Sequence, residues 1–487
     1  MCTTDCSDQL TLWKVGTQQV TVDFEGGAVV SEAGLLAVRQ LERGLGILAE
    51  VAQRLPDPRT QELVTHSTER ILTQQVYQIL AGYFDCNDAG DLRDSPLFQT
   101  LADRSPSDGQ PLASGSTLAR YQHAYTRRDA ELPPEERPVL QERRAAQVDR
   151  IKILNAYLPE LFIRTRPQAP TRVIIDLDAT DDPTHGQQQL TFFNGYYDQY
   201  QYLPLLAFDG ESGFPLAAWL RPGKAHASWG AVEAVRRIVQ TLRQAWPDVV
   251  IVVRGDTGFA VPELYEFCEA EGLLYAFGYA SNAVLKRRTE LKLRYVEAVQ
   301  ELYEEKVQLF DSFTDYQAEG WSRPRRIIAK IEAMPQGTNR RFVVTNLTGT
   351  PQEVYHGFYV QRGNVPEKPI GELKNGLAAD RLSSERFLAN ALRLQYHVLA
   401  YAIVVLFREA NQSVPEVATQ EVGTLRQQVF QAGAVVTTSV RRIWFHFSSS
   451  WPRRELFVRI CRSIAAYLDR LSQTTTDPPV LTAALLK

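Results

Sequence analysis

Apolar residues recur at helical spacing through the first quarter of the chain and at strand spacing through its middle. Between residues 35 and 128 they recur every three or four positions, which predicts a helical N-terminal region. From 171 to 280 the pattern predicts a strand, a hairpin and then helices alternating with strands, which indicates a mixed sheet flanked by helices. Strand-like runs follow from about 306 to 347. Helical periodicity then resumes and leads into a long apolar helix.

Composition indicates a folded protein and gives little sign of its partners. Hydrophobic residues make up 44% and charged residues 23%, and the net charge is −4. The exception is the stretch 381–470, which holds twelve arginines, no lysine and six acidic residues, and could present a basic face. Five cysteines without a CxxC pair favour a reducing, cytoplasmic setting, and no secretory signal is expected. The apolar stretch 398–407 is too short to span a membrane and predicts a buried helix.

Aspartates cluster where the first predicted strand ends, in VIIDLDATDD. Alternation along this strand puts Asp176 and Asp178 on one face. A second apolar run, VVIVVRGDTGF, places Asp256 just past the end of another strand. Ligands bind at the carboxyl ends of strands in open α/β sheets, so Asp178 and Asp256 are candidates to meet at one site. Asp181, Asp182 and Asp209 are better interpreted as turn-formers or helix caps.

Paired carboxylates that bind metal usually need a third acid from another element. The segment YVQRGNVPEKPIGELKNGL, residues 359–377, is the candidate. Tyr359 and Arg362 are three positions apart, and Glu367 and Lys374 are seven apart, so each pair can share a helical face. A solvated, charged helix is the alternative.

Several motifs in order along most of the chain carry a family resemblance. They are TDDPTHGQQQ, YLPLLAF, LRPGKAHASWGA, RGDTGF and ELKNGLAADRLSSERFLAN. Together they resemble the DDE-type transposases of bacterial insertion sequences, in particular the family numbered thirteen-eighty, whose members share a tyrosine, arginine, glutamate, lysine signature. The resemblance implies a DNA transposase with an RNase H-like catalytic domain, which cleaves the element's ends and joins their 3′-hydroxyls to target DNA.

The resemblance also implies the site. Asp178, Asp256 and Glu367 would be the catalytic acids and would hold two Mg²⁺ ions, with Mn²⁺ able to substitute. Tyr359, Arg362 and Lys374 match the rest of the signature and would contact DNA, as would Arg441 and Arg442 in the basic C-terminal stretch. The partner implied is double-stranded DNA, both transposon ends and target, bound by a homodimer at the bacterial nucleoid without a membrane.

One spacing departs from the signature. Four residues separate Arg362 from Glu367 where the family has three, and prolines flank the glutamate. Proline is acceptable in a first helical turn, and the gap from Glu367 to Lys374 matches the family, so Glu367 is preferred over its rival Glu372. Asp176 is expected to be an accessory acid beside Asp178.

The expected fold is a multi-domain α/β protein with an RNase H-like mixed sheet, flanking helices, a β-rich insertion and a helical N-terminal domain. The proline- and charge-rich stretch near residue 130 indicates a linker. The expected divisions are a DNA-binding or dimerisation region (1–130), the first part of the catalytic domain (131–280), the insertion (281–350), the rest of the catalytic domain (351–412) and a basic region (413–487).

Two other functions remain open on the sequence. The run DLDAT fits the D-x-D-x-T start of haloacid-dehalogenase-like phosphatases, in which Asp176 would be the nucleophile. Such enzymes have a later acid in a GDxxxD pattern, but Ala260 stands at that position. The third possibility is a domesticated DNA-binding protein that has lost its chemistry, against which the presence of three candidate acids argues.

Overall fold

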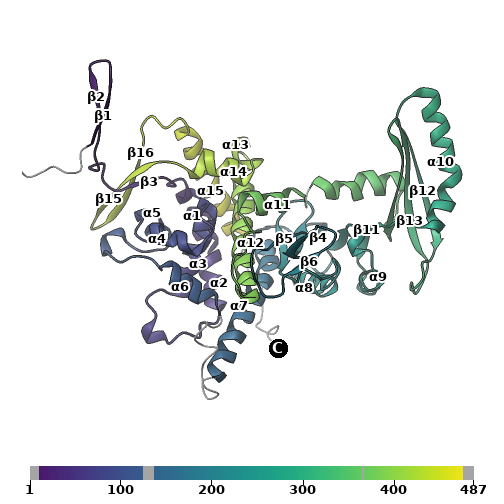
Figure 1. The fold of residues 1–487 in the computed structure, drawn as a ribbon, viewed down its shortest axis with the longest axis horizontal. Coiled ribbons are helices and arrows are strands. Elements are labelled where there is room, and N and C mark those ends of the chain that lie inside the picture. The colour runs from purple at the N-terminus through teal and green to yellow at the C-terminus, as the bar shows by residue number, and fades with distance from the viewer. Residues whose placement is uncertain (1–9, 124–136, 365–366, 475–487) are drawn as a thin grey trace, which may run out of the picture.

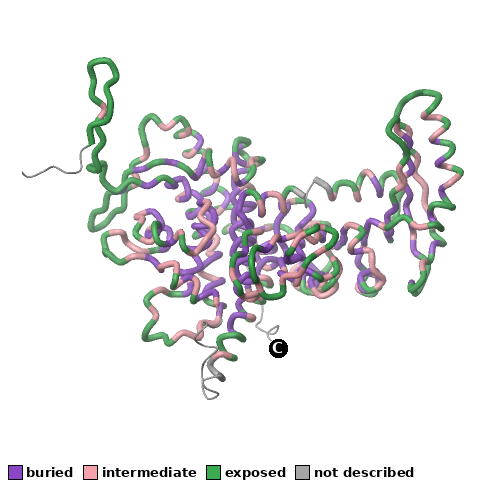
Figure 2. Tube along the Cα trace, viewed as in Figure 1, coloured by how far each residue is buried: buried purple, intermediate pink, exposed green. Residues whose placement is uncertain are grey.

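The structure is a computed structural model that describes residues 10–123, 137–364 and 367–474 (Figure 1). An eight-stranded mixed sheet runs through the protein. The N-terminal helices and the C-terminal strands lie toward one end of the long axis, and residues 283–334 form the other end. Buried residues concentrate in the middle, where the sheet and its covering helices meet (Figure 2).

Helices occupy most of residues 35–122, in agreement with the periodicity there. They are α1 (Leu35–Leu45), α2 (Ile47–Arg54), η1 (Gln61–Leu63), α3 (Thr68–Ala81), η2 (Cys86–Asp88), α4 (Ala89–Leu92), α5 (Pro96–Leu101), η3 (Pro106–Asp108) and α6 (Gly115–Gln122). Ser67 begins α3 in the usual way, because its side chain accepts a hydrogen bond from the Arg70 amide. The chain reaches these helices through strands that the pattern did not predict, namely β1 (Leu10–Val15), β2 (Gln18–Val22) and β3 (Val29–Val30).

Helix α7 (Arg137–Arg164) connects the N-terminal helices to the sheet. It is 28 residues long and packs against the edge of the sheet through buried Leu158, Leu161 and Phe162. The sequence predicted a linker followed by a helix here. The linker itself lies mostly outside the described residues.

The elements of the central sheet follow one another along the chain in the order expected from the sequence. Its strands are β4 (Arg172–Ala179), β8 (Leu205–Asp209), β9 (Pro215–Trp219), β10 (Val250–Gly255) and β11 (Leu274–Tyr279). They lie in the order β9-β8-β4-β10-β11, with β4, β10 and β11 parallel to one another and β8 antiparallel to both of its neighbours, β4 and β9. Since both faces are covered, β4 and β10 are apolar on both sides rather than alternating.

Three helices after β9 form the cover of this sheet, namely α8 (Ala231–Ala245), α9 (Pro262–Ala270) and α12 (Phe387–Ala410). Within the described residues, α12 alone is long and apolar enough to cross a membrane. Its most apolar window is entirely buried inside the protein, which is typical of a core helix (Figure 2). The prediction of a buried helix at residues 398–407 is therefore confirmed.

The stretch expected to be a β-rich insertion begins with a helix. Its elements are α10 (Ala283–Tyr303), β12 (Val307–Tyr316), β13 (Arg325–Met334) and β14 (Gly337–Thr345). The strands are antiparallel, and β14 pairs with β11, so the insertion extends the central sheet. Helix α10 packs on β13 and is the outermost element at this end of the protein (Figure 1).

Short elements complete the molecule. The segment after β14 is broken into η7 (Glu353–Tyr359), η8 (Val360–Asn364), α11 (Glu367–Gly371) and η9 (Glu372–Gly376). A three-stranded sheet beside β4 consists of β5 (Asp182–Pro183), β6 (Phe192–Asn194) and β7 (Gln199–Tyr202), and η6 (Thr257–Phe259) follows β10. The C-terminal part contains α13 (Pro415–Ala418), α14 (Val422–Leu425), η10 (Arg426–Phe430), β15 (Ala434–Ser439), β16 (Arg442–Phe447) and α15 (Arg454–Thr474).

Candidate active site

Asp178 and Asp256 lie at the carboxyl ends of neighbouring parallel strands. In the register of β4 and β10, Asp176 is the partner of Arg254. Asp178 and Asp256 each follow two residues after this pair, so their carboxylates project from the same level of the two neighbouring strand ends. Adjacent strands are about 4.8 Å apart, which is close enough for two carboxylates to share a metal ion.

The local backbone holds each of these aspartates in place. Asp178 accepts a hydrogen bond from the Ala179 amide (2.8 Å), and Asp256 begins η6 by accepting one from the Gly258 amide (2.8 Å). Gly258 has to be a glycine, because a Cβ there would lie 2.7 Å from the Ala227 Cβ. Both aspartates are only half-buried, so solvent or a substrate can reach them.

Asp176 occupies a different environment from Asp178, although both are on one face of β4. Its two oxygens accept hydrogen bonds from Arg254 at 2.6 and 2.7 Å, and both side chains are almost wholly buried. Arg254 also donates to the Phe358 carbonyl (2.7 Å). Gly210 makes room for this pair, since a Cβ there would lie 2.7 Å from Asp176. Asp176 is therefore a partner in a buried ion pair, and the expected accessory acid is not accessible.

Two signature residues lie over the carboxylates. An Nη atom of Arg362 is 3.9 Å from Asp178. Tyr359 is half-buried at the end of η7, with its hydroxyl against Gly278 of β11; a Cβ on Gly278 would approach that oxygen to 2.5 Å. Burial raises the pKa of Tyr359, with Asp256 adding to the rise and Arg362 opposing it. The segment does not form the single helical face that the spacing suggested, because it changes from π to 3₁₀ geometry between these two residues.

The two candidates for the third acid differ in what the structure describes. Glu367 is the first residue of α11, but its side chain lies outside the described part of the structure. Glu372 is buried and accepts two hydrogen bonds of 2.8 Å from Arg408 of α12. Its oxygens are thereby committed to a fixed cation within the core.

Lys374 contacts an aspartate that the sequence suggested was a turn-former. Its ammonium is 2.6 Å from Asp181. Partial burial would favour the neutral form of Asp181, but the hydrogen bonds from Lys374 and Gln199 lower its pKa below the ordinary value. Of the other two, Asp209 does fold a turn, with its side chain accepting from Ser212, whereas Asp182 is a buried residue of β5.

Asp182 is the least compensated acid near the site. It is almost wholly buried, and neither carboxyl oxygen has a hydrogen-bond partner in the described residues. Burial raises its pKa well above the ordinary value, Asp380 and Asp181 add to the rise, and Lys374 opposes it. The same four side chains line a small pocket at this edge of the sheet.

Other predicted residues lie elsewhere. Arg441 and Arg442 are exposed at the turn between β15 and β16, in a separate three-stranded sheet at the end of the molecule far from α10 (Figure 1). They do not converge with the aspartates.

Tyr197, which the sequence analysis did not single out, also stands beside the carboxylates. It lies between β6 and β7. Burial raises its pKa to about 12, with further contributions from Asp181, Tyr196, Asp178 and Asp256. The aromatic run FFNGYYDQYQY, with its Asn-Gly turn, predicts a hairpin, but only the fold places that hairpin next to the site.

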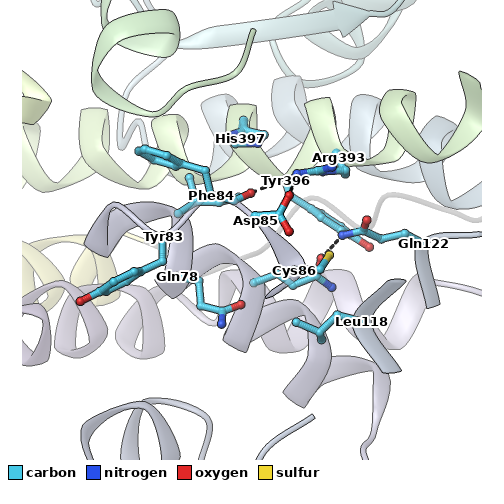
Figure 3. A pocket seen from close by; sticks show the side chains of 12 residues that line it. Gln78, Tyr83, Phe84, Asp85, Cys86, Leu118, Gln122, Arg393, Tyr396 and His397 are labelled. Carbon is cyan, nitrogen blue, oxygen red and sulfur yellow. Dashed lines mark hydrogen bonds and ion pairs between the residues drawn. The ribbon is translucent and has the colours of Figure 1, made fainter. Parts of the chain in front are cut away.

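A second pocket lies between the N-terminal helices and α12 (Figure 3). Arg393 donates to the Phe84 carbonyl, and His397 donates from Nδ1 to the Leu377 carbonyl (2.8 Å). Burial lowers the pKa of His397 to about 3 and raises that of the Cys86 thiol. Neither group is activated, so this pocket joins two parts of the fold and lacks the features of a reactive centre.

The donor set at the sheet edge fits a hard divalent cation. Asp178 and Asp256 supply carboxylate oxygens, the ligands that Mg²⁺ and Mn²⁺ prefer. Among the described side chains no group of three His, Cys, Asp or Glu residues is positioned to hold a metal ion. The third ligand expected from the sequence, Glu367, is not among those side chains.

A match to one protein family covers nearly the whole chain. The family described as transposase DDE domain, group 1, matches residues 13–469. A search of curated proteins finds no significant match. Among solved structures, the chain is similar to one in the cryo-EM structure of the piggyBac transposase synaptic complex with hairpin DNA. The identity is 11% and the TM-score 0.38, over 91% of this chain and 85% of that one.

Proposed function

The chain belongs to the family of transposase DDE domains, and we propose that it cuts the ends of a bacterial insertion sequence and joins the freed 3′-hydroxyls to target DNA. Family membership makes it an enzyme that cleaves and transfers DNA strands. The strand order β9-β8-β4-β10-β11 supports an RNase H-like catalytic domain, and the reaction would take place on the DNA of the nucleoid.

We assign the catalytic and metal-binding roles to Asp178, Asp256 and Glu367. The observation that carries the assignment is the level placement of Asp178 and Asp256 at the ends of β4 and β10, half-buried and reachable. Glu372 is the weaker candidate for the third acid, because Arg408 already occupies both of its oxygens. Two bound Mg²⁺ ions, or Mn²⁺, would activate the attacking oxygen and neutralise the leaving oxygen.

The basic signature residues would position the DNA strand. Arg362, 3.9 Å from Asp178, would bind a phosphate beside the scissile bond, where the guanidinium fork suits bidentate contact. Lys374 would exchange Asp181 for a phosphate oxygen. Tyr359, half-buried with its hydroxyl against Gly278, would hold the start of η8, and with it Arg362, in place. Arg441 and Arg442 would contact the DNA backbone further away.

The phosphatase alternative requires Asp176 to attack a phosphate. Asp176 is wholly buried and both its oxygens are bound by Arg254, so no substrate can approach it. The buried pair therefore favours the transposase over the phosphatase. A purified protein that hydrolysed a phosphate monoester, with the activity lost in Asp176→Asn, would reverse this choice.

The decisive experiment is strand cleavage of a plasmid that carries the DNA flanking this coding sequence on both sides. Wild-type protein with Mg²⁺ or Mn²⁺ is expected to cut at the element's ends, and Asp178→Asn to bind the same DNA without cutting. Binding without cutting by the wild type in either metal would favour a domesticated DNA-binding protein. Asp198→Asn, in the loop between β6 and β7, is the matched control and should cut normally.

A further inference from the structure

Helix α10 of the insertion has a second apolar face, which is directed away from the protein. Leu285, Leu293 and Val296 are buried on its inner face against the insertion strands. On the other face Leu291 and Leu302 are 80% and 72% exposed. Figure 1 shows α10 at the extremity of the molecule, and Figure 2 shows exposed residues along it. So many exposed large apolar side chains on one helix mark a surface that is covered by a partner.

The spacing of this outer face fits a helical partner. The exposed apolar residues Val284, Leu291, Tyr295 and Leu302 are seven, four and seven positions apart, which is heptad spacing. The pattern is also symmetric about Leu293. In an antiparallel pair of two such helices, Val284 of each would face Leu302 of the other, and Leu291 would face Tyr295.

The charges on α10 favour antiparallel pairing with a second α10. The first half is basic, with Lys286, Arg287, Arg288, Lys292 and Arg294 against the single acid Glu290. The end of the helix is acidic, with Glu297 and Glu301, and Glu304 and Glu305 follow directly after it. Antiparallel pairing therefore places the basic half of each helix against the acidic half of the other, whereas parallel pairing would oppose like charges.

Arg287 and Glu301 are suited to contacts between the two paired helices. Arg288, Lys292 and Arg294 already form ion pairs with Asp315, Asp311 and Glu290 in the same chain. Among the described residues, Arg287 and Glu301 form none, and they flank the apolar face on the same side. In the antiparallel arrangement each Arg287 would approach the other chain's Glu301.

We propose that α10 is a dimerisation element, and that two copies of this chain pair through antiparallel α10 helices about a two-fold axis. A closed, self-complementary contact of this kind is the commonest form of homodimer. One helix pair of this length buries less than the roughly 1,600 Å² of a standard interface, so we expect a dimer that dissociates in the micromolar range. The proposal does not depend on which residues hold metal.

The first test measures self-association of the full chain by analytical ultracentrifugation over a range of concentrations. Leu291→Glu is expected to raise the dimer dissociation constant at least tenfold, since it places a charge within the apolar face. Leu63→Glu is the matched control, because Leu63 is also 80% exposed but lies in the N-terminal region. It should leave the dissociation constant unchanged. A wild type that stays monomeric throughout would overturn the proposal.

The second test uses charge reversal. Arg287→Glu and Glu301→Arg are each expected to weaken the homodimer several-fold. An equimolar mixture of the two variants should regain wild-type association, because both contacts then join opposite charges. Failure of the mixture to recover, with both single variants folded by circular dichroism, would overturn the antiparallel pairing.

The third test determines the orientation directly. Val284→Cys and Leu302→Cys proteins are mixed and mildly oxidised. A disulfide-linked dimer is expected in the mixture and not, beyond the wild-type background, in either variant alone. Cross-linking of each variant with itself would indicate a parallel pair. Binding of monomeric wild type to neutral lipid vesicles, lost in Leu291→Glu, would replace the second copy with a membrane surface, and either result would overturn the proposal.

Discussion

Two levels of charge lie on the same pair of strands, two residues apart, and they have opposite characters. At the lower level Asp176 and Arg254 form a bidentate ion pair that is almost completely buried. At the upper level Asp178 and Asp256 are two carboxylates side by side and half-buried. The lower charges cancel each other. The upper two repel each other, and the nearest described cation, Arg362, is 3.9 Å from Asp178 alone, so a further cation between them would be favoured.

This difference shows that residue type and strand face do not by themselves define an active-site acid. Asp176 and Asp178 share both. What separates them is distance from the strand end: Arg254 is still within β10 and can reach across to Asp176, whereas Asp256 is past its end, where the backbone turns into η6. The lower pair supports the fold, and the upper pair is the one to which we assign the chemistry.

The largest effect should come from removing either upper carboxylate. Asp178→Asn and Asp256→Asn are expected to reduce DNA cleavage by more than about 100-fold, since even changes to residues behind metal ligands cost 10- to 100-fold. The free energy of unfolding should change by less than about 1 kcal/mol, because the asparagine oxygen can still accept the hydrogen bond from the backbone amide. Cleavage kinetics and denaturant unfolding of the same preparations test both. A variant that cleaved normally would remove that residue from the site.

The lower pair should behave in the reverse way. Asp176→Asn leaves Arg254 buried without its counter-ion, which should lower the free energy of unfolding by about 3–5 kcal/mol. Denaturant unfolding measures this loss. The double variant Asp176→Leu with Arg254→Met should recover much of the stability, because an apolar pair of similar volume replaces the ions. If Asp176→Asn were as stable as the wild type and failed to cleave, Asp176 would belong to the upper level.

The two glutamates extend the comparison to the signature segment. Glu372→Gln should lower the free energy of unfolding by about 2–3 kcal/mol, because it weakens a charged, partly buried pair of hydrogen bonds to Arg408. Glu367→Gln should leave stability unchanged and abolish cleavage. Cleavage and unfolding measured on both variants decide the third acid. The opposite pattern would exchange their roles.

The sequence predicted those features that depend on one element at a time. Apolar runs placed β4 and β10, and Asp178 and Asp256 lie at or just past the ends of these strands, as the sequence predicted. It could not predict partners that come from distant positions in the chain. The ion pair of Asp176 with Arg254, and that of Lys374 with Asp181, join residues 78 and 193 positions apart.

Helix α10 was missed for a related physical reason. Its apolar residues fall on two faces, so they do not form the single stripe that marks an amphipathic helix, and the strands after it set the character expected for 281–350. The sequence separated Glu367 from its rival Glu372 only by the spacing to Lys374, because both are charged residues of one segment. Burial under Arg408 distinguishes Glu372, and burial is not visible in a local pattern.

Asp182 belongs to neither of these two pairs of residues, and its replacement should change the free energy of unfolding the least. It is buried like Asp176 but has no counter-ion, and its pKa is raised by burial first and then by Asp380 and Asp181. In the unfolded chain an aspartate titrates near its ordinary pKa of about 3.9. The folded protein therefore holds a proton there that the unfolded chain releases as the pH rises. The stability that this protonated carboxyl contributes is fully present below the pKa of the unfolded chain. It is progressively lost as the pH rises to the higher pKa of the folded protein.

Asp182→Asn removes this penalty without changing the shape of the side chain. The variant should be more stable than the wild type by about 1 kcal/mol at pH 8, with the difference shrinking as the pH falls toward 4, because the wild-type carboxyl is then neutral in both states. Denaturant unfolding without metal, at several pH values, measures the difference.

Asp380→Asn is the matched control: it keeps the carboxyl of Asp182 but removes a neighbouring charge that raises its pKa. The stability of this control should therefore decline less with pH than that of the wild type. The opposite result would be an Asp182→Asn variant that is less stable than the wild type at pH 8, with the difference disappearing in acid. Asp182 would then be a charged carboxylate stabilised by Lys374, as Asp176 is by Arg254.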